Sequence, residues 1–326
     1  MQSGLVAAYL DCLRTQRKLS PHTVAAYGRD LQQLLQLAAA LPERPALRDL
    51  RQHQVRTLAA RLHAAGLGPR SIARKLSSWR GFYGWMAEND APAARLAANP
   101  VDGVKAPRRN KPLPKALSAD DAVRLVAQTA PGKDPRDPAE SCNQAMFELL
   151  YSSGLRVSEL VGLDVHFARA GGYQSAGWID LPSREVTVTG KGGKMRQVPI
   201  GQAAVQALSA WLAIRTRCGA QSAPQASVDP HALFLTSRGT RMSARLVQVR
   251  IKRHAQALGL PTQVHPHMLR HSFASHVLQS SGDLRAVQEM LGHASIASTQ
   301  VYTALDFQRL AQVYDQAHPR ARKRQP

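Results

Sequence analysis

Residues 265–276 read HPHMLRHSFASH, and residues 291–303 read LGHASIASTQVYT. Five of the chain's 12 histidines fall in these two stretches, which is far more than an even spread would place there. His267 and Arg270 are three residues apart, so on a helix both side chains can face one anion. We interpret the stretches as one phosphate-handling site, to which His293 and Tyr302 come from the second stretch.

A zinc site is the alternative interpretation of the same histidines. His267 and His271 have the spacing with which two imidazoles bind zinc from one helical face. However, Arg270 stands before His271 where the HExxH motif has its glutamate, and no acidic or cysteine ligand is close in the sequence. The pattern therefore favours a phosphate over a metal ion.

A second arginine comes from residues 154–160, which read GLRVSEL. Gly154 is typical of a helix end, so Arg156 follows directly after a predicted helix. The apolar neighbours of Arg156 indicate a half-buried side chain that could join Arg270 at one phosphate. An ion pair with Glu159 is the alternative role of Arg156.

A lysine-bearing turn lies at residues 190–194, which read GKGGK. The flanking segments 178–182, 184–190 and 195–200 are rich in β-branched residues and predict a three-stranded antiparallel sheet. Glycines permit a tight turn there, so Lys191 and Lys194 are predicted at a hairpin tip.

The charge of the chain points to a polyanionic partner. Its 43 Lys and Arg against 22 Asp and Glu give a net charge of +21, and basic residues outnumber acidic ones both in 1–110 and in 111–326. The 3 cysteines form no paired motif. Because no segment is apolar enough for a membrane span or a secretion signal, we expect a cytoplasmic protein.

The pattern of apolar residues predicts two mainly α-helical domains. Helical periodicity at 2–14, 48–65 and 69–88, together with an amphipathic helix capped by Ser20, predicts a bundle over residues 1–100. The proline-rich and basic stretch 99–115 marks a linker, which we assign to residues 101–117. Residues 118–326 form the second, mostly helical domain. Residues 131–144 and 167–178 are expected to be surface insertions.

These motifs, in their order and spacing, resemble the tyrosine recombinase (phage integrase) family. The matching stretches are GLRVSEL, GKGGK, HPHMLRHSFASH, LGHASIASTQVYT and the tail DFQRLAQVYDQAHPRARKR at 306–324. SPHTVAAYGRDLQQLL at 20–35 is similar to the N-terminal DNA-clamping domain of the family. The resemblance covers essentially the whole chain and implies a SAM-like helical N-terminal domain before a catalytic domain.

The resemblance also implies the catalytic residues. They are Arg156, Lys191, His267, Arg270, His293 and the nucleophile Tyr302, which would form an O-(3′-phospho-DNA)-tyrosine intermediate. It implies neither a metal nor a cofactor.

The chemistry of a phosphodiester is consistent with these residue types. Two arginines can donate to the nonbridging oxygens as negative charge gathers at phosphorus. A phenol has an ordinary pKa of about 10, so Tyr302 needs a base or nearby positive charge, which His267 and the arginines would supply. Lys191 would protonate the leaving 5′ oxygen, and His293 would donate to a nonbridging oxygen.

Other basic and histidine side chains near the motifs are assigned outside the catalytic set. We expect Lys194 and Arg196 to contact phosphates, and we expect His271 and His276 to be packed helix residues. Beyond the motifs, basic residues around a helix that is expected to begin at Ser243 are predicted to contact DNA; these are Arg241, Arg245 and Arg250.

The resemblance implies double-stranded DNA as the substrate and resolution of chromosome dimers at dif-type sites as the role. A XerD-like recombinase in a heterotetramer and an FtsK-like translocase as regulator are the implied partners. The apolar stripe at Phe307, Leu310, Val313 and Tyr314 would dock on a neighbouring subunit. A phage or transposon integrase, a type IB topoisomerase and a non-catalytic DNA-binding protein are the alternatives.

Overall fold

A computed structural model describes residues 2–89, 96, 98–108, 116–190, 193–217, 228–260, 264–292 and 318. The chain divides into two compact units, Met1–Pro112 and Leu113–Pro326. The division falls inside the stretch assigned to the linker. Val101 and Val104 are buried in the core of the first unit, so that core extends beyond residue 100.

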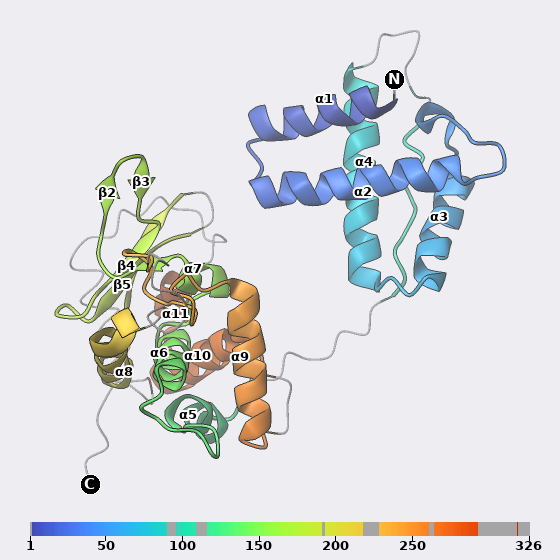
Figure 1. Ribbon diagram of the computed structural model, residues 1–326. Helices are drawn as coiled ribbons and strands as arrows, with labels where there is room; N and C mark the ends of the chain where they lie inside the picture. The colour runs from blue at the N-terminus through green and yellow to red at the C-terminus, as the bar shows by residue number, and fades with distance from the viewer. Residues whose placement is uncertain are drawn as a thin grey trace. The chain divides into compact units, whose positions relative to one another are not determined.

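The first unit is a helical bundle, as the sequence predicts. Its elements are α1 (Gln2–Thr15), α2 (Pro21–Ala39), the 3-10 helix η1 (Leu47–Asp49), α3 (Gln52–Ala64) and α4 (Pro69–Asn89). The Ser20 hydroxyl caps α2 by accepting a hydrogen bond from the backbone N–H of Thr23 at 3.2 Å. Helix α4 crosses and contacts both α1 and α2 (Figure 1). The long helix expected at 48–65 is instead divided into η1 and α3, with Leu50 and Arg51 extended between them.

The second unit is built around one buried helix. Its helices are α5 (Ala119–Ala127), α6 (Pro138–Ser153), α7 (Val157–Val161), α8 (Gln202–Ile214), η3 (Arg215–Arg217), α9 (Ala244–Ala257), α10 (Pro266–Ser281) and α11 (Leu284–Leu291). Nearly every side chain of α6 after Glu140 is buried, and α6 contacts α5, α8 and α10 (Figure 1).

A small sheet covers one side of this unit. Its strands, in spatial order, are β1 (Leu163–Asp164), β4 (Gly177–Asp180), β5 (Glu185–Thr189) and β6 (Met195–Pro199). Strands β4, β5 and β6 pair antiparallel, with Val186 opposite both Ile179 and Val198. The predicted three-stranded antiparallel sheet and the mainly helical fold class are therefore confirmed, and β1 adds a short parallel edge.

The two expected insertions differ in structure. Residues 131–137 are exposed, but α6 begins at Pro138 with Asp137 as its cap, and Cys142 is buried. The prediction of a surface insertion over 131–144 is therefore wrong for its second half, because the Asp-Pro pair starts a helix. In the other insertion, β2 (Arg169–Ala170) and β3 (Tyr173–Gln174) form a short hairpin.

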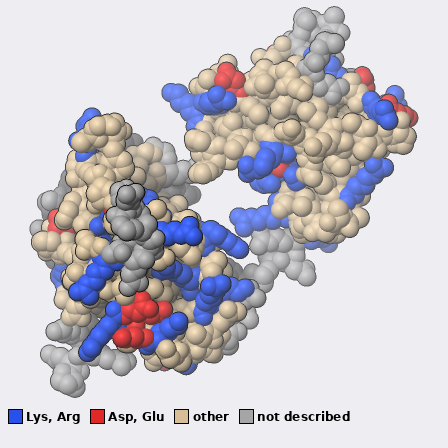
Figure 2. All heavy atoms as spheres, viewed as in Figure 1, with Lys and Arg blue, Asp and Glu red and all other residues tan. Residues whose placement is uncertain are grey.

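Charge is spread over both units. On the face shown in Figure 2, basic side chains occur over both units, whereas acidic side chains gather in a few small groups. In the part of the chain that is described, no helix combines the length and apolar character needed to cross a membrane.

Candidate active site

The site begins at the end of α6, where the geometry requires glycine. Gly154 has a φ of +58° and caps α6. A Cβ on this residue would also lie within 3.0 Å of three ring atoms of Phe273, on α10. Both the positive φ and this close approach exclude larger residues. The chain can therefore turn sharply from α6 into Arg156, the N-cap residue of α7.

Arg270 is buried at the centre of the site. It lies on α10, and its side chain donates one hydrogen bond to the Gly154 carbonyl and another to the Leu291 carbonyl, both at 2.6 Å. Only 8% of the residue is exposed. Arg270 therefore ties the end of α6 to the end of α11. His267, one helical turn before Arg270, is exposed.

Three arginines converge on the C-terminal end of α11. Arg196 Nε donates to the Met290 carbonyl at 3.0 Å, Arg270 donates to the Leu291 carbonyl, and Arg156 Nη2 donates to the Gly292 carbonyl at 3.4 Å. The last carbonyls of a helix lack intrahelical partners and carry partial negative charge, so cations are favoured there. Arginines from β6, α10 and the α6–α7 turn thus meet at residues 290–292, directly before His293 in the sequence.

One carboxylate lies among these arginines. Glu159 is buried, and its carboxylate accepts a hydrogen bond from each Nη atom of Arg196 at 2.9 Å. Arg156 Nη1 donates a third hydrogen bond to this carboxylate at 2.8 Å. Burial disfavours the charged form of Glu159, but the hydrogen bonds and charge of Arg196, followed by those of Arg156, outweigh burial and hold its pKa below the ordinary value. Glu159 is therefore ionised at neutral pH.

The site carries more positive than negative charge. Within the described residues, Arg156 and Arg196 both donate to Glu159, whereas the hydrogen bonds of Arg270 go to backbone carbonyls. Burial, followed by the charge of Arg156, lowers the pKa of Arg270 to about 10, and Glu159 only partly opposes this. Although the His267 side chain reaches the surface, its partial burial lowers its pKa below the ordinary value, with further lowering from His265 and Arg270. Such a site favours an incoming anion and keeps the His267 imidazole neutral.

Three of the six predicted catalytic residues come together in this geometry. Arg156 and Arg270 donate to carbonyls at the end of α11, and His267 lies close enough to both arginines for their charges to lower its pKa. Lys191, His293 and Tyr302 lie outside the described residues. The residues directly before Lys191 and His293 are described and lie near Arg196: a Cβ on Gly190 would lie 3.5 Å from Arg196 Nη1, and one on Gly292 would lie 3.0 Å from Arg196 Cδ.

The structure corrects the expectation that Arg196 contacts phosphate. The residue is 5% exposed, and its guanidinium is bonded to Glu159 and Met290. The alternation of β6 could have indicated this, because Arg196 and Val198 share one strand face and Val198 is apolar. Both suggested roles of Arg156 remain compatible, since its pairing with Glu159 leaves further N–H donors on the guanidinium.

Of the two histidines predicted to be packed helix residues, one is buried and the other is not. His276 is buried as predicted, with the Tyr151 hydroxyl at 2.9 Å from its Nδ1. The prediction for His271 is wrong, because its side chain is exposed. Arg241 is bonded to Asp164 at 2.6 Å, so it braces β1.

The remaining predicted DNA contacts differ in exposure. Arg245 is exposed on α9, whereas Arg250 donates to Asn143 Oδ1 at 3.1 Å. Among the described residues, no group of three His, Cys, Asp or Glu side chains could hold a metal ion.

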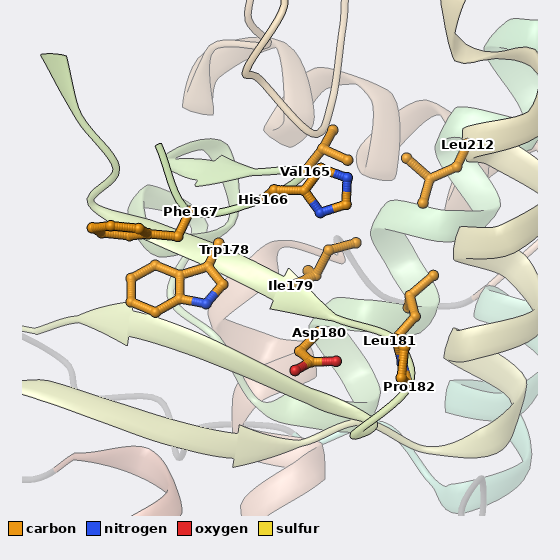
Figure 3. Close-up of a pocket in the computed structure, with 9 residues that line it drawn as sticks. All are labelled: Val165, His166, Phe167, Trp178, Ile179, Asp180, Leu181, Pro182 and Leu212. Atoms are coloured by element: carbon orange, nitrogen blue, oxygen red, sulfur yellow. The ribbon is translucent and has the colours of Figure 1, made fainter. Parts of the chain in front are cut away.

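A separate, mostly apolar cavity of about 440 Å³ lies beside β4 (Figure 3). Phe167 and Trp178 line one part of it, with ring centroids 4.9 Å apart, and Leu181 and Leu212 line another. Its lining includes none of the predicted catalytic residues. It is therefore not the phosphate-handling site.

The chain matches known proteins over nearly its full length. Residues 115–309 match the phage integrase family, and residues 6–89 match the N-terminal SAM-like domain of phage integrases. Tyrosine recombinase XerC 1 of Ralstonia nicotianae is 57% identical over 98% of this chain and 94% of the relative. Tyrosine recombinase XerC of Pseudomonas aeruginosa is 46% identical over 97% and 95% of the two chains.

Solved structures agree with the fold. The integrase of transposon Tn1549 in complex with transposon right end DNA has a TM-score of 0.64 at 18% identity, covering 94% of this chain and 98% of that one. XerH site-specific recombinase bound to palindromic difH substrate has a TM-score of 0.63 at 18% identity, covering 97% and 84%. The chain belongs to the phage integrase family and is a site-specific tyrosine recombinase, a DNA strand-transferase.

Proposed function

We propose that this recombinase cuts a DNA strand by attack of Tyr302 and holds the 3′ phosphate as a phosphotyrosine until another strand's 5′ hydroxyl displaces it. The bond to Tyr302 conserves the energy of the broken phosphodiester, so rejoining needs no ATP. Two such exchanges would pass through a Holliday junction. The observation that carries this proposal is the excess of buried arginine over carboxylate at the end of α11.

The described residues supply the charge that the reaction needs. Arg156 and Arg270 would donate to the nonbridging oxygens and stabilise the pentacoordinate phosphorus. His267, with its lowered pKa, is neutral at pH 7 and would accept the phenolic proton of Tyr302. Because the arginines neutralise the developing charge, we propose that the reaction is independent of metal ions.

The remaining roles follow from family membership. Lys191 would protonate the 5′ oxygen that leaves, and His293 would donate to a nonbridging oxygen. Residues 1–100 would clamp the duplex from one side, with 101–117 as linker and 118–326 as catalytic domain. The basic charge of both parts of the chain supports DNA as their common partner.

The relatives support a role in chromosome maintenance. Several carry the name XerC at 44–57% identity. We propose that the chain acts at dif-type sites in the cytoplasm, in a heterotetramer with a XerD-like recombinase and under an FtsK-like translocase. Integration of mobile DNA is the second candidate, since the fold is shared with the Tn1549 integrase. Strand exchange on dif-type half-sites that requires a XerD-like protein would separate the two functions.

A nicked suicide duplex tests the cleavage chemistry. Wild-type protein should form a covalent adduct that survives denaturing electrophoresis, and Tyr302→Phe should form none. Tyr173→Phe is the matched control, because the Tyr173 hydroxyl contacts Asp164 and Arg241 instead of the site. An adduct that persists in Tyr302→Phe would refute the assignment of the nucleophile.

The general acid is tested with a modified leaving group. Lys191→Ala should slow cleavage of the normal duplex but not of a duplex with a 5′-bridging phosphorothiolate, whose sulfur leaves without a proton. Lys194→Ala, in the same hairpin turn, removes an expected phosphate contact but no proton donor, so any slowing should be equal on the two duplexes and the sulfur substrate should give no rescue. If the sulfur substrate does not rescue Lys191→Ala, another group donates the proton.

A further inference from the structure

We infer that Arg196 is a positioning residue for cleavage, which holds Arg156 in place through Glu159. The inference rests on the proposed function of Arg156 as a phosphate ligand. It assigns a role in the reaction to a side chain that would not itself touch the DNA.

The hydrogen bonds form a continuous chain from β6 to Arg156. Arg196 Nη1 and Nη2 donate to Glu159 Oε1 and Oε2, each at 2.9 Å. The same carboxylate accepts Arg156 Nη1 at 2.8 Å and the backbone N–H of Arg156 at 2.8 Å. A bidentate pair fixes both the place and the plane of a carboxylate. Arg196 therefore fixes the acceptor that orients Arg156.

Arg196 is itself held on its other side. Its Nε donates to the Met290 carbonyl at 3.0 Å. A Cβ on Gly292 would lie 3.0–3.2 Å from three atoms of the Arg196 side chain, and Gly292 has a φ of +63°. Glycine at this position therefore leaves room for the Arg196 side chain, which a larger residue would displace. The residue before His293 thus abuts the side chain that orients Arg156.

The side chains of Arg196 and Arg156 differ in their exposure to solvent. The side chain of Arg196 is 5% exposed, whereas that of Arg156 is 32% exposed. Arg156 can therefore meet a phosphate at the surface, while Arg196 is enclosed behind it. Lysine cannot replace Arg196, because a single ammonium lacks the planar fork that grips both carboxylate oxygens.

The test compares Arg196→Lys and Arg196→Met with wild type in single-turnover cleavage of the suicide duplex. Both variants should cleave about 10- to 100-fold more slowly, the range found when outer-shell partners of metal ligands are removed. Arg215→Lys is the matched control. Arg215 is 7% exposed and donates to the carbonyls of Ala232 and Asp229. The Arg215→Lys variant should have a lower melting temperature, but below that temperature it should cleave at the wild-type rate.

A double-variant cycle distinguishes positioning from folding. If Arg196 acts through Arg156, adding Arg196→Lys to Arg156→Ala should slow cleavage by less than about twofold more. A full additional loss in the Arg156→Ala background would overturn the inference, as would wild-type rates in folded Arg196→Lys. Should Arg196→Met fail to fold, Arg196→Lys still decides, since it keeps the charge. If wild-type protein forms no adduct, the proposed function itself fails.

Discussion

In each unit a buried carboxylate lies between two cations, and the two arrangements differ in their net charge. In the first unit, Asp30 is fully buried and pairs with Arg74 and with Lys75, the latter at 2.8 Å. In the second unit, Glu159 pairs with Arg156 and Arg196, but Arg270 lies beside them. The bonds described for Arg270 go to the carbonyls of Gly154 and Leu291.

The difference separates a structural network from one suited to a ligand. The backbone carbonyl of Asp30 also accepts a hydrogen bond from the indole N–H of Trp79. The network of Asp30 therefore joins α2 to α4. In the second unit, burial and then the charge of Arg156 lower the pKa of Arg270, and Glu159 only partly opposes this. Unbalanced positive charge costs stability, and a bound phosphate relieves that cost.

The largest expected effect follows from removing Arg270. Arg270→Met should slow covalent cleavage by about 10³-fold, or about 4 kcal/mol, because a buried donor to the transition state is lost. Single-turnover cleavage below the melting temperature measures the effect. Arg136→Met, in the exposed loop 131–137, should cleave as the wild type does. A loss of less than tenfold for Arg270→Met would show that the charge excess does not serve the chemistry.

The next effect tests the first unit. Asp30→Asn should lower the stability of that unit by about 3 kcal/mol, because it leaves Lys75 buried beside a neutral partner. Chemical denaturation followed by Trp fluorescence checks this. Asp11→Asn removes the exposed ion pair with Arg14, at 3.8 Å, and should change nothing measurable. Slower cleavage by folded, DNA-saturated Asp30→Asn would mean that the first network also serves the reaction.

The pH dependence of cleavage should reveal the lowered pKa of His267, which partial burial and the neighbouring cationic side chains cause. As a base, His267 acts when deprotonated, so activity is present above its pKa and is lost as the pH falls through it. Because that pKa is lowered, the acid limb of kcat/KM should lie below the ordinary histidine value of about 6.5. Removing the positive charge in Arg270→Met should raise the His267 pKa measured by NMR. An unchanged His267 titration in this variant would contradict the coupling.

The smallest effect is the response to a simple anion. Sulfate at matched ionic strength should stabilise the second unit by about 1 kcal/mol, through binding to the folded state alone. The stabilisation should disappear in Arg270→Met and persist in Asp30→Asn. Equal sulfate responses in all three proteins would show that the ion acts through the solvent instead of the site.

Local signals account for what sequence reasoning predicted correctly. The Ser20 cap, the periodicity of α4 and the alternation of β5 each depend on residues close in the chain, and each structural element follows its pattern. The error at Arg196 arises where packing decides, whereas the error at 131–144 overlooks the local Asp-Pro start of α6. The helix end at Gly154 was predicted, but nothing local shows that Phe273, more than a hundred residues later, presses against it.

The sequence by itself determined the residue types of the site, since GLR, HxxR and LGH stand in family order. It also predicted the helix end before Arg156 and the strand that carries Arg196. Only the tertiary structure decided that Arg196 is enclosed and that three successive carbonyls at the end of α11, those of residues 290–292, accept hydrogen bonds from Arg196, Arg270 and Arg156. The reason is physical: burial and charge balance depend on contacts between segments far apart in the chain, which no local pattern contains.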